Sequence, residues 1–151
     1  MAIKTIFNPL LEEGFQKLND SAGTNPIFLQ TGRTTNNVQL SLSGSKTITV
    51  QSVQSFITRV TAIQSVNTGA GTVGDVWVHE FRGAVKKIDP AGSALIVDSV
   101  TDEYIAEDAA MTGVSVAIVA GVSTLDINVT GETGKTIEWK AETIFSEIIY
   151  V

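Results

Sequence analysis

Two glycine-rich segments are the residues whose spacing could bind a nucleotide. Gly69, Gly71 and Gly74 make a literal G-x-G-x-x-G, and Gly134-Lys135-Thr136 matches the end of a phosphate-binding loop. Both chemistries require the glycines to lead into a helix whose N-terminus faces the phosphate. Residues of alternating polarity follow both segments instead, and the first glycine of a complete phosphate loop would fall at Val129. We therefore predict two hairpin loops and no nucleotide cofactor.

The single histidine, His79, is the next residue that could do chemistry. On a strand it would share a face with Trp77 and Phe81, while Glu80 and Arg82 would share the other face. A Ser-His-acid triad would need a serine and an acid brought in from elsewhere, and the sequence has no G-x-S-x-G element to place that serine. We predict a structural histidine, a Glu80–Arg82 neighbour pair and no catalytic residue.

An acidic cluster offers oxygen ligands of the kind that Ca²⁺ prefers. It consists of Asp98, Asp102, Glu103, Glu107 and Asp108. The spacing does not match a calcium-binding EF-hand loop, so we predict a solvated loop and no metal site, with Ca²⁺ left open as the alternative. The stretch 102–111 is also compatible with one or two turns of helix.

Composition narrows the class of protein. The chain has 151 residues, enough for one domain with a substantial core, and 43% of them are hydrophobic. Only 17% are charged, so much of the surface must be Thr, Ser, Asn, Gln and Gly, which suits β-sheets and subunit interfaces. The net charge of −6 argues against nucleic acid as a partner. No segment resembles a signal peptide or a membrane span, and the absence of cysteine excludes disulfides.

The elements that would position these residues are strands. From Val38 onward, short runs with a period of two alternate with turns such as Asp89-Pro90-Ala91-Gly92. We predict that residues 35–151 form an all-β domain, a β-sandwich of jelly-roll type, with Trp77 and Trp139 buried. Residues 137–151 fit either a helical stripe or a strand, and we predict a strand.

Residues 1–34 differ from the rest because their apolar side chains follow no single period. We predict an extended N-terminal arm and linker that docks onto another protein chain, although packing onto its own domain is the alternative. The predicted docking residues are Ile3, Ile6, Phe7, Pro9, Leu10, Leu11, Phe15 and Leu18.

Several motifs, in a fixed order over roughly residues 55–150, resemble a small β-domain of tailed-bacteriophage virion proteins. They are Gly83-Ala-Val-Lys-Lys, the turn at Pro90–Gly92, Leu95-Ile-Val, Glu107-Asp108 and Val129-Thr-Gly-Glu-Thr-Gly-Lys-Thr-Ile-Glu-Trp. The start, Ile6-Phe-Asn-Pro-Leu, also resembles the anchoring peptide of short phage structural proteins. The chain departs from that peptide at residues 10–13, where Leu and Glu replace its turn residues.

This resemblance implies a virion component that is not an enzyme, that forms a homotrimer and that carries no cofactor. We predict a capsid decoration or head-fibre protein at the phage particle surface, made in the bacterial host cytoplasm. Its arm would dock onto the major capsid protein or another virion protein. One alternative is a tail, neck or receptor-binding appendage on the same fold, and another is a carbohydrate-binding module. A host glycan is left open as a further partner, and no nucleic acid or membrane is expected.

Overall fold

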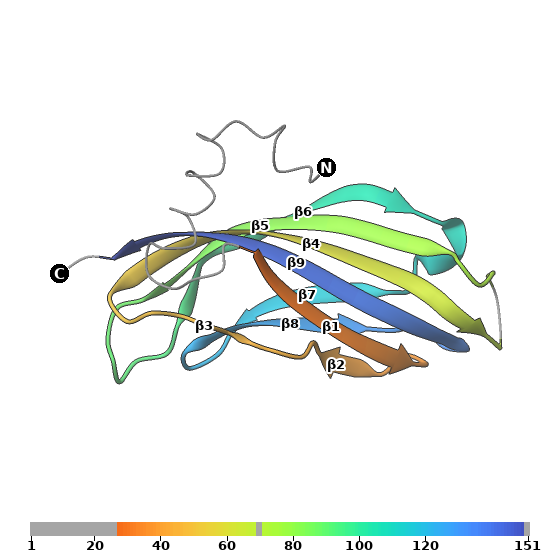
Figure 1. The fold of residues 1–151 in the computed structure, drawn as a ribbon, viewed down its shortest axis with the longest axis horizontal. Coiled ribbons are helices and arrows are strands. Elements are labelled where there is room, and N and C mark those ends of the chain that lie inside the picture. Colours follow the sequence, from red (N-terminus) through yellow and green to blue (C-terminus); the bar gives the residue numbers. More distant parts are fainter. Residues whose placement is uncertain (1–26, 69–70, 150–151) are drawn as a thin grey trace, which may run out of the picture.

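The computed structural model describes residues 27–68 and 71–149, which form a fold built almost wholly of β-strands (Figure 1). The described strands are β1 (Ile27–Thr35), β2 (Gln39–Ser41), β3 (Lys46–Thr47), β4 (Ser52–Asn67), β5 (Val76–Lys87), β6 (Leu95–Glu107), β7 (Ser115–Ala120), β8 (Thr124–Thr130) and β9 (Lys135–Ile149). A short 3-10 helix, Ala109–Met111, lies between β6 and β7. No helix in the described ranges is long and apolar enough to cross a membrane.

The strands form two antiparallel layers. A five-stranded sheet has the order β1-β9-β4-β5-β6, and in Figure 1 its strands β4, β5, β6 and β9 lie above β7 and β8 of the smaller sheet. In the smaller sheet β8 is central: β7 pairs along it, and β2 and β3 pair with successive parts of it. Two facing antiparallel sheets confirm the predicted all-β sandwich.

The core lies between the sheets and contains both tryptophans. Trp77 of β5 meets Trp139 of β9 edge to face, with ring centroids 6.3 Å apart. The indole Nε1 of Trp139 donates a hydrogen bond to Thr34 Oγ1 at 2.9 Å, which satisfies the buried polar atom of the ring. Both indoles are buried, as the sequence predicted. A second apolar cluster around Phe56 and Leu125 extends the core along the sandwich.

The C-terminal segment is a strand, which confirms the prediction for residues 137–149. Strand β9 pairs with β1 on one side and with β4 on the other. Its buried side chains alternate over Ile137, Trp139, Ala141 and Thr143, a period of two. The helical stripe considered from the sequence would have placed residues three and four apart on one face, and the structure does not do so.

The boundary drawn at residue 34 is wrong for residues 27–34. These residues belong to β1, an edge strand of the five-stranded sheet that pairs with β9 along its whole length. Gly32 makes close packing possible, because a Cβ there would lie 2.7 Å from Leu42 Cδ2. Residues 1–26, the remainder of the predicted arm, lie outside the described residues.

The helical turns that the sequence allowed for residues 102–111 form only at the end of that range. Strand β6 continues to Glu107, and only Ala109–Met111 forms a turn of 3-10 helix. Pairing with β5 overrides the local helical pattern, because β6 gains a ladder of hydrogen bonds from Leu95 to Glu107. The acidic residues from Asp98 to Glu107 therefore lie on a strand, not on a loop.

Candidate functional site

The most distinctive surface of the molecule is the side of the five-stranded sheet that faces away from β8. We call it the outer face. It combines exposed aliphatic side chains with charged side chains, among which Glu80 is buried, from all five strands. Its residues are Ile27, Leu29, Arg33, Val53, Ile57, Arg59, Ile63, Glu80, Arg82, Lys86, Leu95, Val97, Glu103, Glu138, Lys140, Glu142, Ile144 and Ile148.

Three isoleucines form a row across the outer face. Ile144 of β9 lies opposite Ile27 of β1 on one side and opposite Ile57 of β4 on the other. Ile57 is 42% exposed and Ile144 is 51% exposed, so both side chains remain partly exposed to solvent within this chain. Because directly opposite side chains in antiparallel strands lie about 5 Å apart, the row is continuous.

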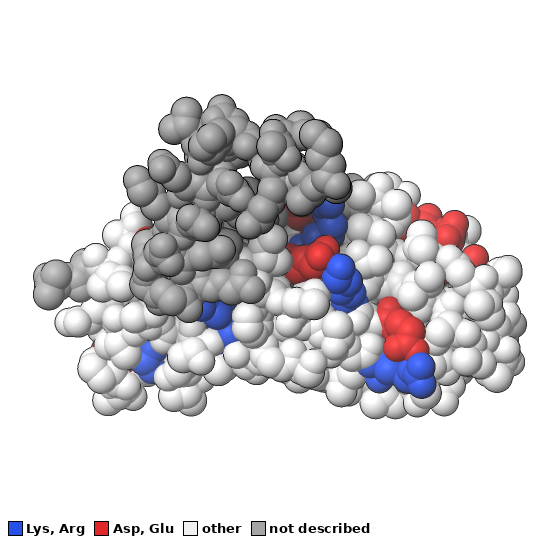
Figure 2. Space-filling model, in the orientation of Figure 1, with Lys and Arg blue, Asp and Glu red and all other residues white. Residues whose placement is uncertain are grey.

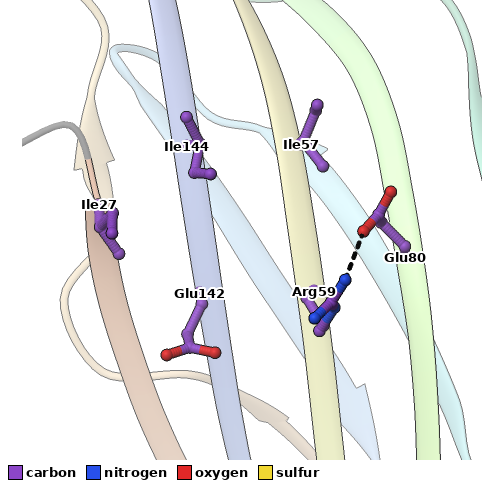
Figure 3. Close-up of a pocket in the computed structure, with 6 residues that line it drawn as sticks. All are labelled: Ile27, Ile57, Arg59, Glu80, Glu142 and Ile144. Carbon is purple, nitrogen blue, oxygen red and sulfur yellow. Dashed lines mark hydrogen bonds and ion pairs between the residues drawn. The ribbon is translucent and has the colours of Figure 1, made fainter. Parts of the chain in front are cut away.

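A shallow hollow of about 240 Å³ lies beside this row. Figure 3 shows Ile144 and Ile57 above Glu142 and Arg59, with Ile27 on one side and Glu80 on the other. The hollow is open and lined mainly by apolar atoms. This shape suits an apolar side chain of a partner better than a small substrate, which binds in deeper and more enclosed sites.

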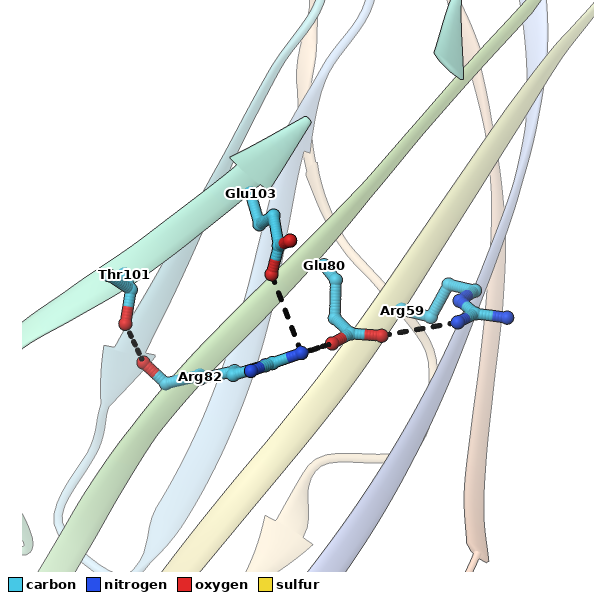
Figure 4. Close-up of polar contacts among 5 residues, drawn as sticks. All are labelled: Arg59, Glu80, Arg82, Thr101 and Glu103. Carbon is cyan, nitrogen blue, oxygen red and sulfur yellow. Dashed lines mark hydrogen bonds and ion pairs between the residues drawn. The ribbon is translucent and has the colours of Figure 1, made fainter. Parts of the chain in front are cut away.

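The next row of the outer face is charged. Arg59 donates to one oxygen of Glu80 at 3.2 Å, and Arg82 donates to the other at 2.6 and 2.9 Å. The guanidinium of Arg82 also lies 3.4 Å from Glu103. Figure 4 shows this chain of contacts running from β4 through β5 to β6. The pair of Glu80 and Arg82 was predicted from the sequence, whereas Arg59 and Glu103 were not.

Arginine contacts lower the pKa of two acids of the outer face, Glu80 and Glu138. The hydrogen bond from Arg82 is the main reason why the pKa of Glu80 lies below its ordinary value. The hydrogen bond from Arg33 does the same to the pKa of Glu138, at the other end of the face. Each guanidinium is held in place by a carboxylate of its own chain, so it presents a fixed, planar group to a partner.

The outer face also holds every arginine of the chain. Arg33 comes from β1, Arg59 from β4 and Arg82 from β5, and the sequence has no other. Arginine is enriched at protein–protein interfaces, whereas lysine, glutamate and aspartate are depleted there. Figure 2 shows groups in which acidic and basic side chains lie beside one another on the visible surface. Wide areas without charge separate one group from the next.

His79 lies on the opposite side of β5, as predicted. Its ring stacks on Trp77 with centroids 3.9 Å apart, and its Nδ1 lies 2.7 Å from Asp102 Oδ1. Glu107 and Tyr104 complete its surroundings. This set contains an acid–imidazole pair but no serine, so it is not a Ser-His-acid triad. Sequence reasoning missed Asp102 as the partner, because only the β5–β6 register brings the two residues together.

The acidic cluster does not converge on one point as a whole. Asp102 and Glu107 lie beside His79, Glu103 contacts Arg82, and Asp108 accepts a 2.8 Å hydrogen bond from the backbone N–H of Val76. In the part of the chain that the structure describes, no group of three or more His, Asp or Glu side chains is placed to hold a metal ion.

Strands follow both glycine-rich segments. Gly71 and Gly74 have φ of +93° and +101°, and they precede β5 within the β4–β5 hairpin. Lys135, the lysine of the second motif, is buried: its Nζ donates to Ala110 O and lies 2.7 Å from Glu132. That ammonium is already neutralised within the chain, so it does not point toward a phosphate. Residues 69 and 70 lie outside the described ranges.

The predicted docking residues of the arm also lie outside the described ranges, so the structure places none of them. They are Ile3, Ile6, Phe7, Pro9, Leu10, Leu11, Phe15 and Leu18. The sequence analysis did not single out the aliphatic residues of the outer face. The alternation of β4 was visible, but both of its faces mix polar and apolar residues, so the pattern does not say which face remains exposed.

No protein-family model matches the chain, and no curated protein matches it. Solved structures similar to it include three tailspike proteins of Acinetobacter phages. That of phage vB_ApiP_P1 matches at 13% identity and a TM-score of 0.42, over 81% of this chain and 21% of that one. That of phage AM24 matches at 13% identity and a TM-score of 0.40, over 79% of this chain and 26% of that one.

The third is the tailspike protein of Acinetobacter baumannii bacteriophage Fri1, described as a capsular polysaccharide depolymerase. It matches at 14% identity and a TM-score of 0.37, over 80% of this chain and 18% of that one. This chain therefore spans about a fifth to a quarter of the length of the tailspikes it matches. At TM-scores below 0.5, the likeness does not transfer a function.

The matches correct the prediction about enzymatic activity. The prediction that the chain is not an enzyme is wrong as an exclusion, because one of the similar structures is a depolymerase, which is an enzyme.

Proposed function

We propose that this chain is a β-sandwich module of a bacteriophage virion protein, of the tail-appendage type, and that it works by assembling with other protein chains. The outer face is the observation that carries the proposal. Aliphatic side chains that are about half exposed, beside arginines fixed by their own ion pairs, are what a protein partner would cover.

Two further observations support the phage assignment. The ordered motifs over residues 55–150 resemble a virion β-domain, and the structure places the final one on the β8–β9 hairpin within the sandwich. The low charged fraction of 17% also suits a surface that is covered by neighbours in an assembly. The resemblance implies three copies, and a homotrimer is therefore part of the proposal.

The segment before β1 has a separate role in this proposal. We place the docking element that attaches the module to another virion protein in residues 1–26, with the eight apolar residues named above as its contacts. This revises the predicted boundary, because residues 27–34 are needed for the sheet. An extended segment can bury many apolar side chains on a partner, each worth about 1.5–3 kcal/mol when fully buried.

Electron microscopy of negatively stained virions, labelled with an antibody against this chain, tests the location. We expect label at the tail end of the particle. Label distributed over the head would establish the capsid-decoration or head-fibre function instead, with the major capsid protein as the docking partner. Intact virions that carry no label, while the same antibody detects the purified chain, would refute a virion role altogether.

A deletion of residues 1–26 tests the docking segment. The shortened chain should keep the circular dichroism spectrum of a β-protein, because the described strands begin at Ile27. It should fail to enter particles in a complementation assay. The matched variant is the full chain with all eight predicted docking residues replaced by serine, because it keeps the length of the segment. Normal incorporation of both variants would contradict the assignment.

A further inference from the structure

We propose that the outer face is the surface on which a second copy of this chain packs. The inference rests on the proposed function as an assembling virion module, and it names both the partner and the interface. Three properties of the face support it: the continuity of its apolar rows, the concentration of arginine and the balance of its charges.

A second apolar group lies on one side of the isoleucine row. Val53 of β4 lies opposite Ile148 of β9, with Ser55 and Ser146 between this pair and the isoleucines, and Leu95 of β6 lies beyond Lys86 of β5. Ile148 is 71% exposed. Scattered single apolar residues are normal on a surface, but a contiguous set across several strands marks an interaction site.

Two of the three arginines lie beside the isoleucine row, and Arg33 lies on the edge strand β1. Arg82 is directly opposite Ile57 in the β4–β5 register, and Arg59 is two residues further along β4. Fixed arginines beside aliphatic side chains are the composition of an interface centre, where arginine, unlike lysine, contributes strongly to binding. Lys140, whose charge is met by Glu142 at 2.8 Å, lies nearer the edge strand β1.

The charge balance decides between a second copy and another class of partner. The outer face carries five basic residues and four acidic ones. The rest of the chain therefore holds five basic and twelve acidic residues. Two copies that each carry a net charge of −6 repel one another over most of their surfaces. The outer face is the region where contact between copies adds no such repulsion.

An acidic partner is the occupant that these charges disfavour. Arg33, Arg59 and Arg82 each contact a carboxylate of the same chain, so they offer little uncompensated positive charge. A face with nearly balanced charges and exposed aliphatic side chains is complementary to another face of the same kind, and a second copy supplies one. Homo-oligomers also make up most soluble assemblies.

The test compares the double variant Ile57→Glu/Ile144→Glu with Val119→Glu in the full chain. Val119 is the matched control, because it is an aliphatic residue 40% exposed on β7 of the other sheet. Sedimentation equilibrium of each protein would give its mass and its dissociation constant. The wild type and Val119→Glu should sediment as oligomers. The double variant should dissociate at least on the order of a hundredfold more readily, toward the monomer mass of 16.0 kDa.

A second measurement avoids the risk that the double variant misfolds. The chain has no cysteine, so the thiol of an Ile144→Cys variant would be the only one present. Its rate of reaction with a maleimide should fall as protein concentration rises, because association covers it. The thiol of a Val119→Cys variant should react at a rate independent of concentration.

Three outcomes would overturn the inference. The first is a wild type that is monomeric at tens of micromolar. The second is an oligomer that the Ile57→Glu/Ile144→Glu variant leaves intact. The third is a thiol at position 144 that is protected at every concentration until residues 1–26 are deleted, which would show that the chain's own N-terminal segment covers the face. Label at the virion tail together with a monomeric chain would refute this inference and the homotrimer, and would leave the assignment as a tail-appendage module standing. A chain that associates through the outer face, in virions that carry no antibody label, would support this inference and refute the virion role.

Discussion

The two faces of the five-stranded sheet differ in a way that the polarity of their residues does not anticipate. The inner face buries polar side chains, among them Gln54, Thr58 and Thr143, whereas the outer face exposes Ile57 and Ile144. Some of the inner polar groups are paired within the chain: the hydroxyls of Thr58 and Thr143 are 2.8 Å apart, and Gln54 Nε2 donates to Glu147 at 2.7 Å. Burial in this sheet therefore follows from which face meets the second sheet, and the aliphatic side chains of the outer face stay partly exposed.

The largest expected difference between the faces is in stability. Trp139→Ala should lower the free energy of unfolding by about 3–5 kcal/mol, because the indole is 2% exposed and packs on Trp77. Ile144→Ala, the matched truncation on the outer face, should cost about 1 kcal/mol at most, because half of that side chain is already in water. Urea unfolding at one low protein concentration would measure both. Equal losses would show that the outer face is as buried as the core.

A second contrast uses two adjacent residues of β5. A Cβ added to Gly83 would lie 2.7 Å from Phe56 Cζ, so Gly83→Val should cost about 1–3 kcal/mol through overpacking. Ala84→Val points to the outer face and should change stability by about 0.5 kcal/mol or less. Thermal melts of the two variants would show the difference. If Ala84→Val is the more destabilising of the two, the assignment of the faces is wrong.

A third prediction concerns the polar pair of the inner face. Thr58→Val should cost about 1–2 kcal/mol, because it leaves the buried hydroxyl of Thr143 without its partner. The double variant Thr58→Val/Thr143→Val should recover most of this loss, since no unsatisfied hydroxyl remains. Denaturant unfolding of the wild type, the two single variants and the double variant gives the coupling free energy between Thr58 and Thr143. Simple additivity of the two single substitutions would mean that the hydrogen bond contributes nothing.

The smallest expected effect is the pH dependence of the outer face. Because Arg82 lowers the pKa of Glu80 below its ordinary 4.5, the stabilisation is present above that value and is lost as the pH falls through the folded-state pKa. Glu138, held by Arg33, acts with the same sign. Glu80→Gln should therefore reduce the loss of stability below pH 4.5 and leave the other pH dependence unchanged. Unfolding midpoints measured from pH 7 downward would reveal it. Identical profiles for the variant and the wild type would refute the contribution.

Local sequence predicts most of the strands and little of the candidate site. Glu80 and Arg82 are two residues apart, so their placement on one face follows from the period of a strand. Arg33, Arg59 and Glu103 come from three other strands, and only the register of β1, β4, β5 and β6 brings them to the same face. The contact of Asp102 with His79 depends on register in the same way.

The sequence by itself determined the all-β class, the strand over residues 137–149, the strands after the glycine-rich segments and the burial of both tryptophans. These features depend on alternation and on turn residues, which act over a few positions. The tertiary structure alone decided the recruitment of residues 27–35 as an edge strand, the extension of β6 to Glu107 and the choice of which face of β4 is covered. In β4 both faces mix polar and apolar side chains, so only the position of the second sheet buries one face and leaves the other available to a partner.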